Sequence, residues 1–298
     1  MPLDVLPHPK SALSKVGALI KGTIMIPLFF VPLLIINLIQ SLSVLLLPIS
    51  RQWVRSINRA CAGGWWTLCD LLAKHAYGIE IVIEGDELPL QENIMVVANH
   101  QSMPDINTLF RLARQQRRIG DIKWFVKDII KYIPGIGWGM IFLDCIFLKR
   151  DWQKDRVRLK NQLKRFEDEQ IPIWTISFIE GTRFTAAKHK KSVEYAAKQG
   201  IEPHNHLLIP RVKGFNLTLD SLRSHLDGVY DVTIGYVEGV PTLWQWVSGQ
   251  VKRVNIYVRR YPIDSIPEGD EALTKWIKER WYEKDVLLEK YYESGQWT

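Results

Sequence analysis

The pattern of apolar and polar positions predicts a regular succession of strands and helices beyond residue 60. Short apolar runs, typical of buried strands, are separated by longer amphipathic stretches, typical of surface helices. The predicted strands are 78–84, 93–98, 122–126, 144–149, 172–178, 206–210, 229–238 and 253–259. The predicted helices are 52–75, 104–118, 152–168 and 269–294. This succession predicts an α/β fold in which a mixed sheet is flanked by helices.

The longest apolar stretch runs from Thr23 to Ser50 and contains no charged residue. Its length exceeds the roughly 20 residues of one membrane span, and it is too long for a signal peptide. Pro27, Pro32 and Pro48 oppose a single straight helix. Three cations on each side give no orientation by the positive-inside rule. We therefore expect an N-terminal membrane-embedded helical hairpin, with a single span or a buried soluble helix as alternatives.

The positive charge of the chain is concentrated at its N-terminal end. The formal net charge is +7, and residues 1–60 hold six Lys and Arg against one Asp, which gives +5 and leaves +2 for the other 238 residues. A basic flank of this kind suits an anionic membrane surface. A nucleic-acid-binding protein would instead carry its basic surface on the folded domain. We therefore predict a membrane-anchoring segment at 1–60, a folded domain at 61–298, membrane lipids as partners and no nucleic acid.

The cysteines and tryptophans add two smaller constraints. Cys61, Cys69 and Cys145 fit neither a disulfide framework nor a zinc pattern, which indicates a reducing compartment and no metal site. The 12 tryptophans are numerous for a chain of 298 residues, as in proteins that lie at a membrane interface.

The most informative short motif is a histidine five positions before an aspartate, His100 and Asp105. The apolar run 94–98 predicts a buried strand before it, and Pro104 suits the first turn of a following helix. A carboxylate on one ring nitrogen fixes the tautomer, so the other nitrogen can accept a proton from a hydroxyl. Taken alone, the spacing also fits a structural loop histidine that is hydrogen-bonded to a helix-start aspartate.

Three further blocks follow in a fixed order. They are an apolar strand ending in two cations at 145–150, a strand running into Glu-Gly-Thr-Arg at 177–183, and an apolar run closed by proline at 207–215. Together with the His-x4-Asp block they resemble the glycerolipid acyltransferase family, which includes the 1-acylglycerol-3-phosphate acyltransferases. The resemblance covers about residues 75–265. The sequences of segments 147–152 and 210–215 are most similar to the lysocardiolipin and lysophospholipid acyltransferase branch.

The resemblance implies that an acyl thioester and a lipid hydroxyl are the reactants. His100 is then the general base and Asp105 its orienting partner. Because the substrate supplies the attacking oxygen, no acyl-enzyme is required. The chain also lacks the Gly-x-Ser-x-Gly elbow of α/β serine hydrolases.

A phosphate-bearing acceptor requires fixed cations. Arg183 is the first candidate, since guanidinium binds phosphate through paired N–H groups, and Arg150 is the second. Gly181 permits a tight turn, and Thr182 can add a donor. The resemblance associates Glu180 and its neighbours with glycerol phosphate; because a carboxylate repels phosphate, we expect Glu180 to hold Arg183 or a glycerol hydroxyl. The alternatives are a capped turn with a surface ion pair and, for Arg150, a solvated strand end.

The fourth block is linked by the resemblance to the acyl donor. Pro210 ends the predicted strand, and Lys213 and Arg211 suit the phosphates of coenzyme A or the acidic surface of acyl carrier protein. A solvated position of these side chains is the alternative. No other cofactor is expected, because the acyl donor is a co-substrate.

Together these features predict a membrane-bound O-acyltransferase that acylates the sn-2 hydroxyl of 1-acylglycerol 3-phosphate to give phosphatidic acid. Its catalytic domain is expected to face the cytoplasm, at the inner membrane if the source is bacterial. A variant that acylates another lysophospholipid, such as lysophosphatidylglycerol or lysocardiolipin, stays open. Alternatives of a different class are a thioesterase or lipase and a non-catalytic lipid-binding protein.

Overall fold

A computed structural model of the chain describes residues 4–149 and 151–297. The α-helices are α1 Ala12–Ser43, α2 Arg51–His75, α3 Pro104–Gln115, α4 Ile136–Phe142, α5 Trp152–Asp168, α6 Ala186–Gln199, α7 Val212–Leu222, α8 Leu243–Val247 and α9 Asp270–Ser294. The strands are β1 Glu80–Gly85, β2 Ile94–Ala98, β3 Ile122–Lys127, β4 Ile146–Leu148, β5 Trp174–Ser177, β6 Gly228–Gly235 and β7 Arg253–Pro262. Short 3-10 helices lie at Val44–Leu46, Ile119–Asp121, Asp128–Tyr132 and Ile263–Ser265.

Within these described residues the strands form one seven-stranded sheet in the order β1-β7-β6-β2-β5-β3-β4. β6 and β7 pair antiparallel, and the other neighbouring strands are parallel. The predicted mixed α/β sheet is therefore confirmed. The parallel strands β2, β5, β3, β4 and β6 all deliver their carboxyl ends to the same edge, where sites of such sheets usually lie.

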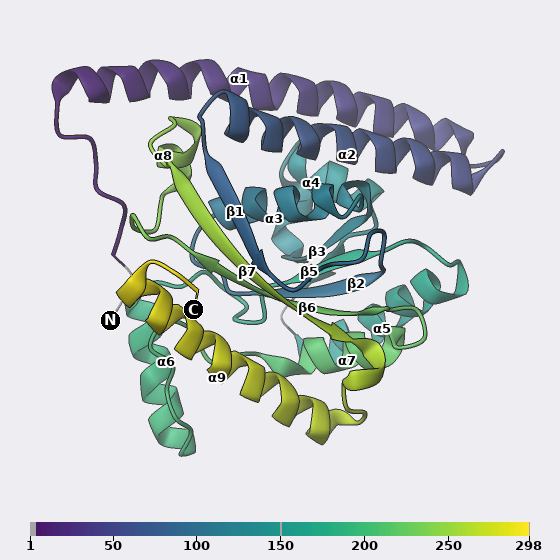
Figure 1. The fold of residues 1–298 in the computed structure, drawn as a ribbon. Coiled ribbons are helices and arrows are strands. Elements are labelled where there is room, and N and C mark those ends of the chain that lie inside the picture. The colour runs from purple at the N-terminus through teal and green to yellow at the C-terminus, as the bar shows by residue number, and fades with distance from the viewer. Residues whose placement is uncertain (1–3, 150, 298) are drawn as a thin grey trace.

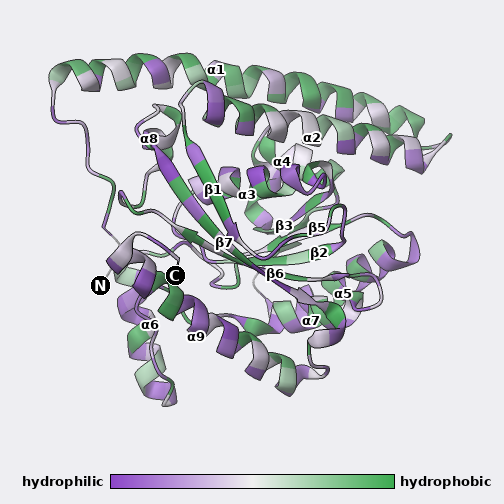
Figure 2. Cartoon of the chain, in the orientation of Figure 1, coloured by the Kyte–Doolittle hydropathy of each residue, from purple (hydrophilic) through white to green (hydrophobic). Residues whose placement is uncertain are grey.

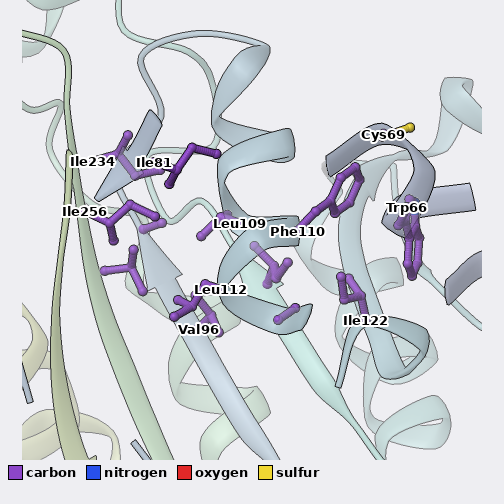
Figure 3. Close-up of a cluster of buried hydrophobic side chains, with 14 of the residues drawn as sticks. Trp66, Cys69, Ile81, Val96, Leu109, Phe110, Leu112, Ile122, Ile234 and Ile256 are labelled. Atoms are coloured by element: carbon purple, nitrogen blue, oxygen red, sulfur yellow. The ribbon is translucent and has the colours of Figure 1, made fainter. Parts of the chain in front are cut away.

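Helices cover both faces of this sheet (Figure 1). The central strand β2 is buried on both sides because its side chains alternate between two cores. Ile94 and Val96 face the core shared with α2 and α3, where Trp66 and Phe110 also pack (Figure 3). Met95 lies in the second core, which α5, α7 and α9 cover. The predicted boundary at residue 60 falls within α2, which packs directly on the folded domain.

The first helix lies outside these layers, along α2 (Figure 1). It is apolar over most of its length (Figure 2), and most of its large apolar side chains are exposed. The segment Ala12–Leu46 is long and apolar enough to cross a membrane. α1 continues unbroken through Pro27 and Pro32. The prediction that the prolines divide the apolar stretch into a hairpin is therefore wrong. Most of the stretch belongs to the single helix α1, and the chain turns back only at residues 44–50, before α2.

One predicted strand, 206–210, is wrong. This segment pairs with no strand, and side chains satisfy its backbone instead. The Leu208 N–H donates to the Glu180 carboxylate, and the Ile209 N–H donates to Ser192 Oγ. The apolar run is thus a buried irregular segment whose course depends on side-chain acceptors.

Candidate active site

The predicted histidine and aspartate lie at the carboxyl edge of the sheet, between β2 and α3. Asn99 directly follows β2 and is fixed to β6 by its side chain. Its amide donates to the Ile234 carbonyl (2.9 Å), and its Oδ1 accepts from the Ile234 N–H (2.8 Å). Pro104 begins α3, and Asp105 lies in the first turn of that helix, where a carboxylate interacts favourably with the helix dipole. The loop between them is therefore held at both ends.

His100 and Asp105 form a direct hydrogen bond. The distance from His100 Nδ1 to Asp105 Oδ2 is 2.9 Å, and the aspartate is fully buried. The same oxygen accepts the backbone N–H groups of Gln101 (2.7 Å) and Ser102 (2.9 Å). An oxygen with these donors acts as an acceptor toward the ring, so Nδ1 carries the hydrogen and Nε2 has a free lone pair.

The ring is positioned further by an aromatic contact. His100 stacks on Phe178, which follows β5, with ring centroids 4.0 Å apart and planes inclined by 14°. The side chain is only 12% exposed. Among residues 4–149 and 151–297, no hydrogen bond reaches Nε2. This nitrogen is therefore available to a substrate hydroxyl.

Tyr236 is a site residue that the sequence analysis missed. Its hydroxyl donates to Asp105 Oδ1 at 2.6 Å, and both side chains are buried. The tyrosine lies just beyond β6, and its pKa is raised well above the usual value by burial, with the Asp105 charge as a smaller cause. Asp105 is thus fixed through both oxygens, one toward the histidine loop and one toward Tyr236.

We expect Tyr236→Phe to lower kcat by about 3- to 10-fold. Asp105 then loses the hydrogen bond that fixes its second oxygen, so it holds the His100 ring less firmly in the reactive orientation. The measurement is kcat at saturating donor and acceptor.

Tyr230→Phe is the matched control, because the Tyr230 hydroxyl donates to Glu92, a carboxylate outside this site, at 2.8 Å. Each variant should lose about 1.5–3 kcal/mol of unfolding free energy. An equal kcat in both variants would show that Tyr236 does not help to position Asp105.

Glu180 has a different position from the one the sequence analysis expected. Its Oε1 accepts the His100 backbone N–H (2.9 Å), and its Oε2 accepts the Leu208 N–H (3.3 Å). In the described part of the chain, no hydrogen bond or ion pair joins it to Arg183. Glu180 therefore ties three of the four sequence blocks together. Burial raises its pKa from 4.5 to about 8, opposed by these two N–H donors.

This shift predicts a pH dependence of stability. Between pH 4.5 and about 8 the folded chain holds a proton on Glu180 that the unfolded chain has lost. The contribution is fully present below pH 4.5 and is lost as the pH rises through about 8. Urea unfolding of wild type and Glu180→Gln should therefore show a free-energy difference that changes across this range. A difference that is constant with pH would show that Glu180 titrates normally.

The rest of the Glu-Gly-Thr-Arg block forms the turn between β5 and α6. Gly181 has a φ of +68°, which favours glycine, and the Arg211 side chain packs against it, 3.0 Å from where a Cβ would lie. Thr182 Oγ1 accepts from Lys188 Nζ at 2.7 Å. The Arg183 side chain is exposed. No ion pair joins either arginine to a carboxylate within the described residues.

The remaining predicted binding residues form no hydrogen bond with the His100–Asp105 pair among the described residues. Pro210 is buried just before α7. Lys213 is exposed, with its ammonium 6.0 Å from the centre of the Trp152 ring. Arg150 lies outside the described residues. The structure thus groups Gly181, Thr182 and Arg183 with the dyad and adds Arg211 as a neighbouring cation.

A buried lysine connects α9 to the floor of the site. Lys284 Nζ lies 2.6 Å from Asp231 Oδ1 and donates to the Val232 carbonyl (2.6 Å) and the Val97 carbonyl (3.3 Å). Burial lowers its pKa, and Asp231 opposes this effect. The helical sequence pattern gave no sign of this role, because Lys284 contacts β2 and β6 only through the tertiary fold.

Comparisons with known proteins agree with this arrangement. Family models described as Acyltransferase and Acyltransferase C-terminus match residues 80–235 and 245–298. The second match extends the likeness beyond residue 265, where the sequence analysis ended it. The solved structure of the 1-acyl-sn-glycerophosphate (LPA) acyltransferase PlsC from Thermotoga maritima has the same fold, with a TM-score of 0.50 at 19% identity over 93% of this chain and 98% of that one.

Several curated relatives are similar over most of the chain. A 1-acyl-sn-glycerol-3-phosphate acyltransferase 2 from Arabidopsis thaliana is 34% identical over 282 residues, which are 91% of this chain and 72% of that protein. The delta form from Homo sapiens is 34% identical, covering 88% and 71%. Lysocardiolipin acyltransferase 1 from Gallus gallus is 32% identical, covering 84% and 68%.

Proposed function

The chain belongs to the acyltransferase family, and from this premise we propose that it transfers a fatty acyl group to the sn-2 hydroxyl of 1-acylglycerol 3-phosphate, giving phosphatidic acid. The observation that carries the proposal is the His100–Asp105 pair with its unpaired Nε2. The names of the relatives supply the substrate class.

The geometry supports a direct transfer. His100 Nε2 takes the proton of the acceptor hydroxyl while the hydroxyl oxygen attacks the thioester carbonyl carbon. The tetrahedral intermediate then breaks its C–S bond, and the imidazolium returns the proton to the leaving thiolate. Asp105 stabilises the imidazolium between these two proton transfers. The acyl donor, acyl-CoA or acyl carrier protein, is a co-substrate, and this sequence of steps uses no metal.

The acceptor phosphate binds beside this dyad at Arg183 and Arg211 in the proposed complex. Both guanidinium groups belong to the loops that Glu180 joins, and neither is committed to a carboxylate among the described residues. Arg183→Ala is expected to raise KM for lysophosphatidic acid by about 10- to 100-fold, because a charge-assisted contact is lost, with kcat changed only a few-fold.

The control variant is Lys190→Ala, which removes an exposed cation of α6 outside this turn. The control substrate is 1-acylglycerol, which has no phosphate and should be used equally by wild type and Arg183→Ala. An unchanged KM for lysophosphatidic acid in Arg183→Ala would place the phosphate elsewhere.

The acyl donor binds near the start of α7, and α1 contacts the membrane, in the proposed complex. Pro210 shapes the turn into α7, and Lys213 lies two residues beyond Arg211, where it meets phosphates of coenzyme A or an acidic carrier protein. α1 embeds in the membrane through its exposed apolar face, and the catalytic domain faces the cytoplasm, where acyl donors are made.

An acyl-transfer assay tests this function. Detergent-solubilised protein is offered labelled oleoyl-CoA with lysophosphatidic acid, lysophosphatidylglycerol or lysocardiolipin. Phosphatidic acid should be the main product. Transfer only to lysocardiolipin would favour the second candidate, to which the Gallus gallus relative points. Free coenzyme A without lipid product would indicate a thioesterase and contradict the proposal.

A further inference from the structure

A polar cavity lies at the edge of the sheet opposite to the edge that holds His100. It has a volume of about 450 Å³ and is enclosed by the start of α2, the 142–144 turn and the 169–172 loop. Its charged lining residues are Arg55, Arg59, Asp121, Lys123, Asp144 and Glu169. Lys123 is the second residue of β3 and lies level with Met95 near the start of β2, whereas His100 follows the end of that strand. The cavity is therefore separate from the catalytic site.

Lys123 is the unusual member of this lining. Its side chain is buried, with the residue only 6% exposed. No hydrogen bond or ion pair joins its ammonium to any residue of the ranges 4–149 and 151–297. Burial lowers its pKa, and Cys145, Asp144 and Asp121 oppose this effect only in part. A buried cation of this kind is costly unless an anion compensates it.

The acidic residues of the cavity are already paired with other cations. Asp121 pairs with Arg59 at 2.6 Å and with Arg118 at 3.2 Å. Asp144 pairs with Arg165 at 2.6 Å.

Glu169 pairs with Arg55. Including Lys123, five cations therefore meet three carboxylates, and the surplus charge is positive. The ligand that fits this cavity is an anion that accepts hydrogen bonds from several N–H groups, such as a phosphate.

The position of the cavity indicates where such a phosphate would come from. α2 follows directly on the apolar turn at 44–50, where Leu45 and Ile49 are exposed, and Trp53 in the first turn of α2 is exposed as well. At the rise of an α-helix, Arg55 and Arg59 lie roughly 8–14 Å from Ser50 along its axis, near the headgroup layer of a bilayer that holds the apolar turn. The first turn of α2 also contains no acidic residue, so its dipole favours an anion.

We propose that this cavity binds the phosphate of a membrane lipid headgroup, with Lys123 at its floor and Arg59 and Arg55 at its mouth. The site differs from the acceptor site, and it rests on the membrane contact of α1 proposed above. Binding there would hold the catalytic domain at a fixed depth against the membrane surface. It would also supply the counter-charge that Lys123 lacks.

The test follows the reactivity of Lys123 itself. The full-length protein is reconstituted in phosphatidylcholine vesicles with or without phosphatidylglycerol, treated briefly with acetic anhydride, and analysed by mass spectrometry. Phosphatidylglycerol should slow acetylation of Lys123 by about tenfold at a saturating level and leave exposed Lys278 unaffected. An unchanged rate at Lys123 would overturn the site. Equal protection by inorganic phosphate in phosphatidylcholine vesicles would overturn the assignment to a lipid.

A binding measurement with variants completes the test. Dihexanoylphosphatidylglycerol is titrated calorimetrically into protein in a neutral detergent. Lys123→Met should weaken binding by at least about tenfold, and Lys278→Met, which removes the same charge elsewhere, should not. If Lys123→Met does not fold, Arg59→Gln replaces it, because the Arg59 side chain is 51% exposed and Arg118 still pairs with Asp121. Equal affinity of Lys278→Met and of Lys123→Met, or of its replacement Arg59→Gln, for the lipid would refute the proposal.

The outcome is independent of the proposed function. His100→Ala should lower acyl transfer by about 10²–10⁴-fold and keep the protection of Lys123. Lys123→Met should keep acyl transfer in detergent. These two variants therefore distinguish failure of the proposed acyl transfer from failure of the proposed lipid-phosphate site.

Discussion

Replacement of His100 by alanine is expected to lower the rate of acyl transfer by about 10²–10⁴-fold, the usual contribution of a general base. The neighbouring Asp105 cannot replace it as the base, because this carboxylate is buried and engaged by four donors. The rate is measured with saturating lysophosphatidic acid and oleoyl-CoA, and circular dichroism checks that the fold is intact.

The matched control is His75→Ala, which removes an exposed imidazole at the end of α2. It should retain full activity. If His100→Ala also retained activity near that of wild type, the mechanism proposed for this site would be wrong.

Asp105→Asn is expected to lower kcat/KM by about 10- to 10³-fold, because the charge that stabilises the imidazolium formed during transfer is removed. The hydrogen-bonding geometry should survive. Two backbone N–H groups keep the amide oxygen on their side, and the amide nitrogen then faces the Tyr236 hydroxyl, which can rotate to accept it. The tautomer of His100 should therefore be retained while the charge is lost.

Asn107→Asp, which changes the charge of the same helix outside the dyad, is the control for this variant. Activity of Asp105→Asn close to that of wild type would show that Asp105 does not act through its charge.

The sequence predicts the parts of this molecule whose determinants are local. β2 and α3 follow from an apolar run and a helix-start proline, and the His100–Asp105 contact follows from their junction. The four ordered blocks also identify the family, because their combination is specific. The mixed sheet follows from the alternation of patterns over the domain.

Other features depend on contacts that no local pattern reveals. α6 exposes most of its side chains and buries only Ala196, so it has no apolar stripe to detect. Tyr236 contacts Asp105 across 131 positions, and Lys284 contacts Val97 across 187. Adjacency in sequence predicts that Glu180 holds Arg183 or a glycerol hydroxyl, but the fold directs its carboxylate to the backbone of two distant loops.

The central claim is that the substrate hydroxyl, activated by His100, attacks the acyl thioester directly. It is tested most directly by a single-turnover experiment with stoichiometric radiolabelled oleoyl-CoA. Enzyme is mixed with donor alone, then with donor and lysophosphatidic acid, and protein and lipid are separated after rapid acid quenching. We expect no label on the protein in either mixture, and labelled phosphatidic acid only when the acceptor is present. Label that appears on the protein and then passes to lysophosphatidic acid would contradict direct transfer.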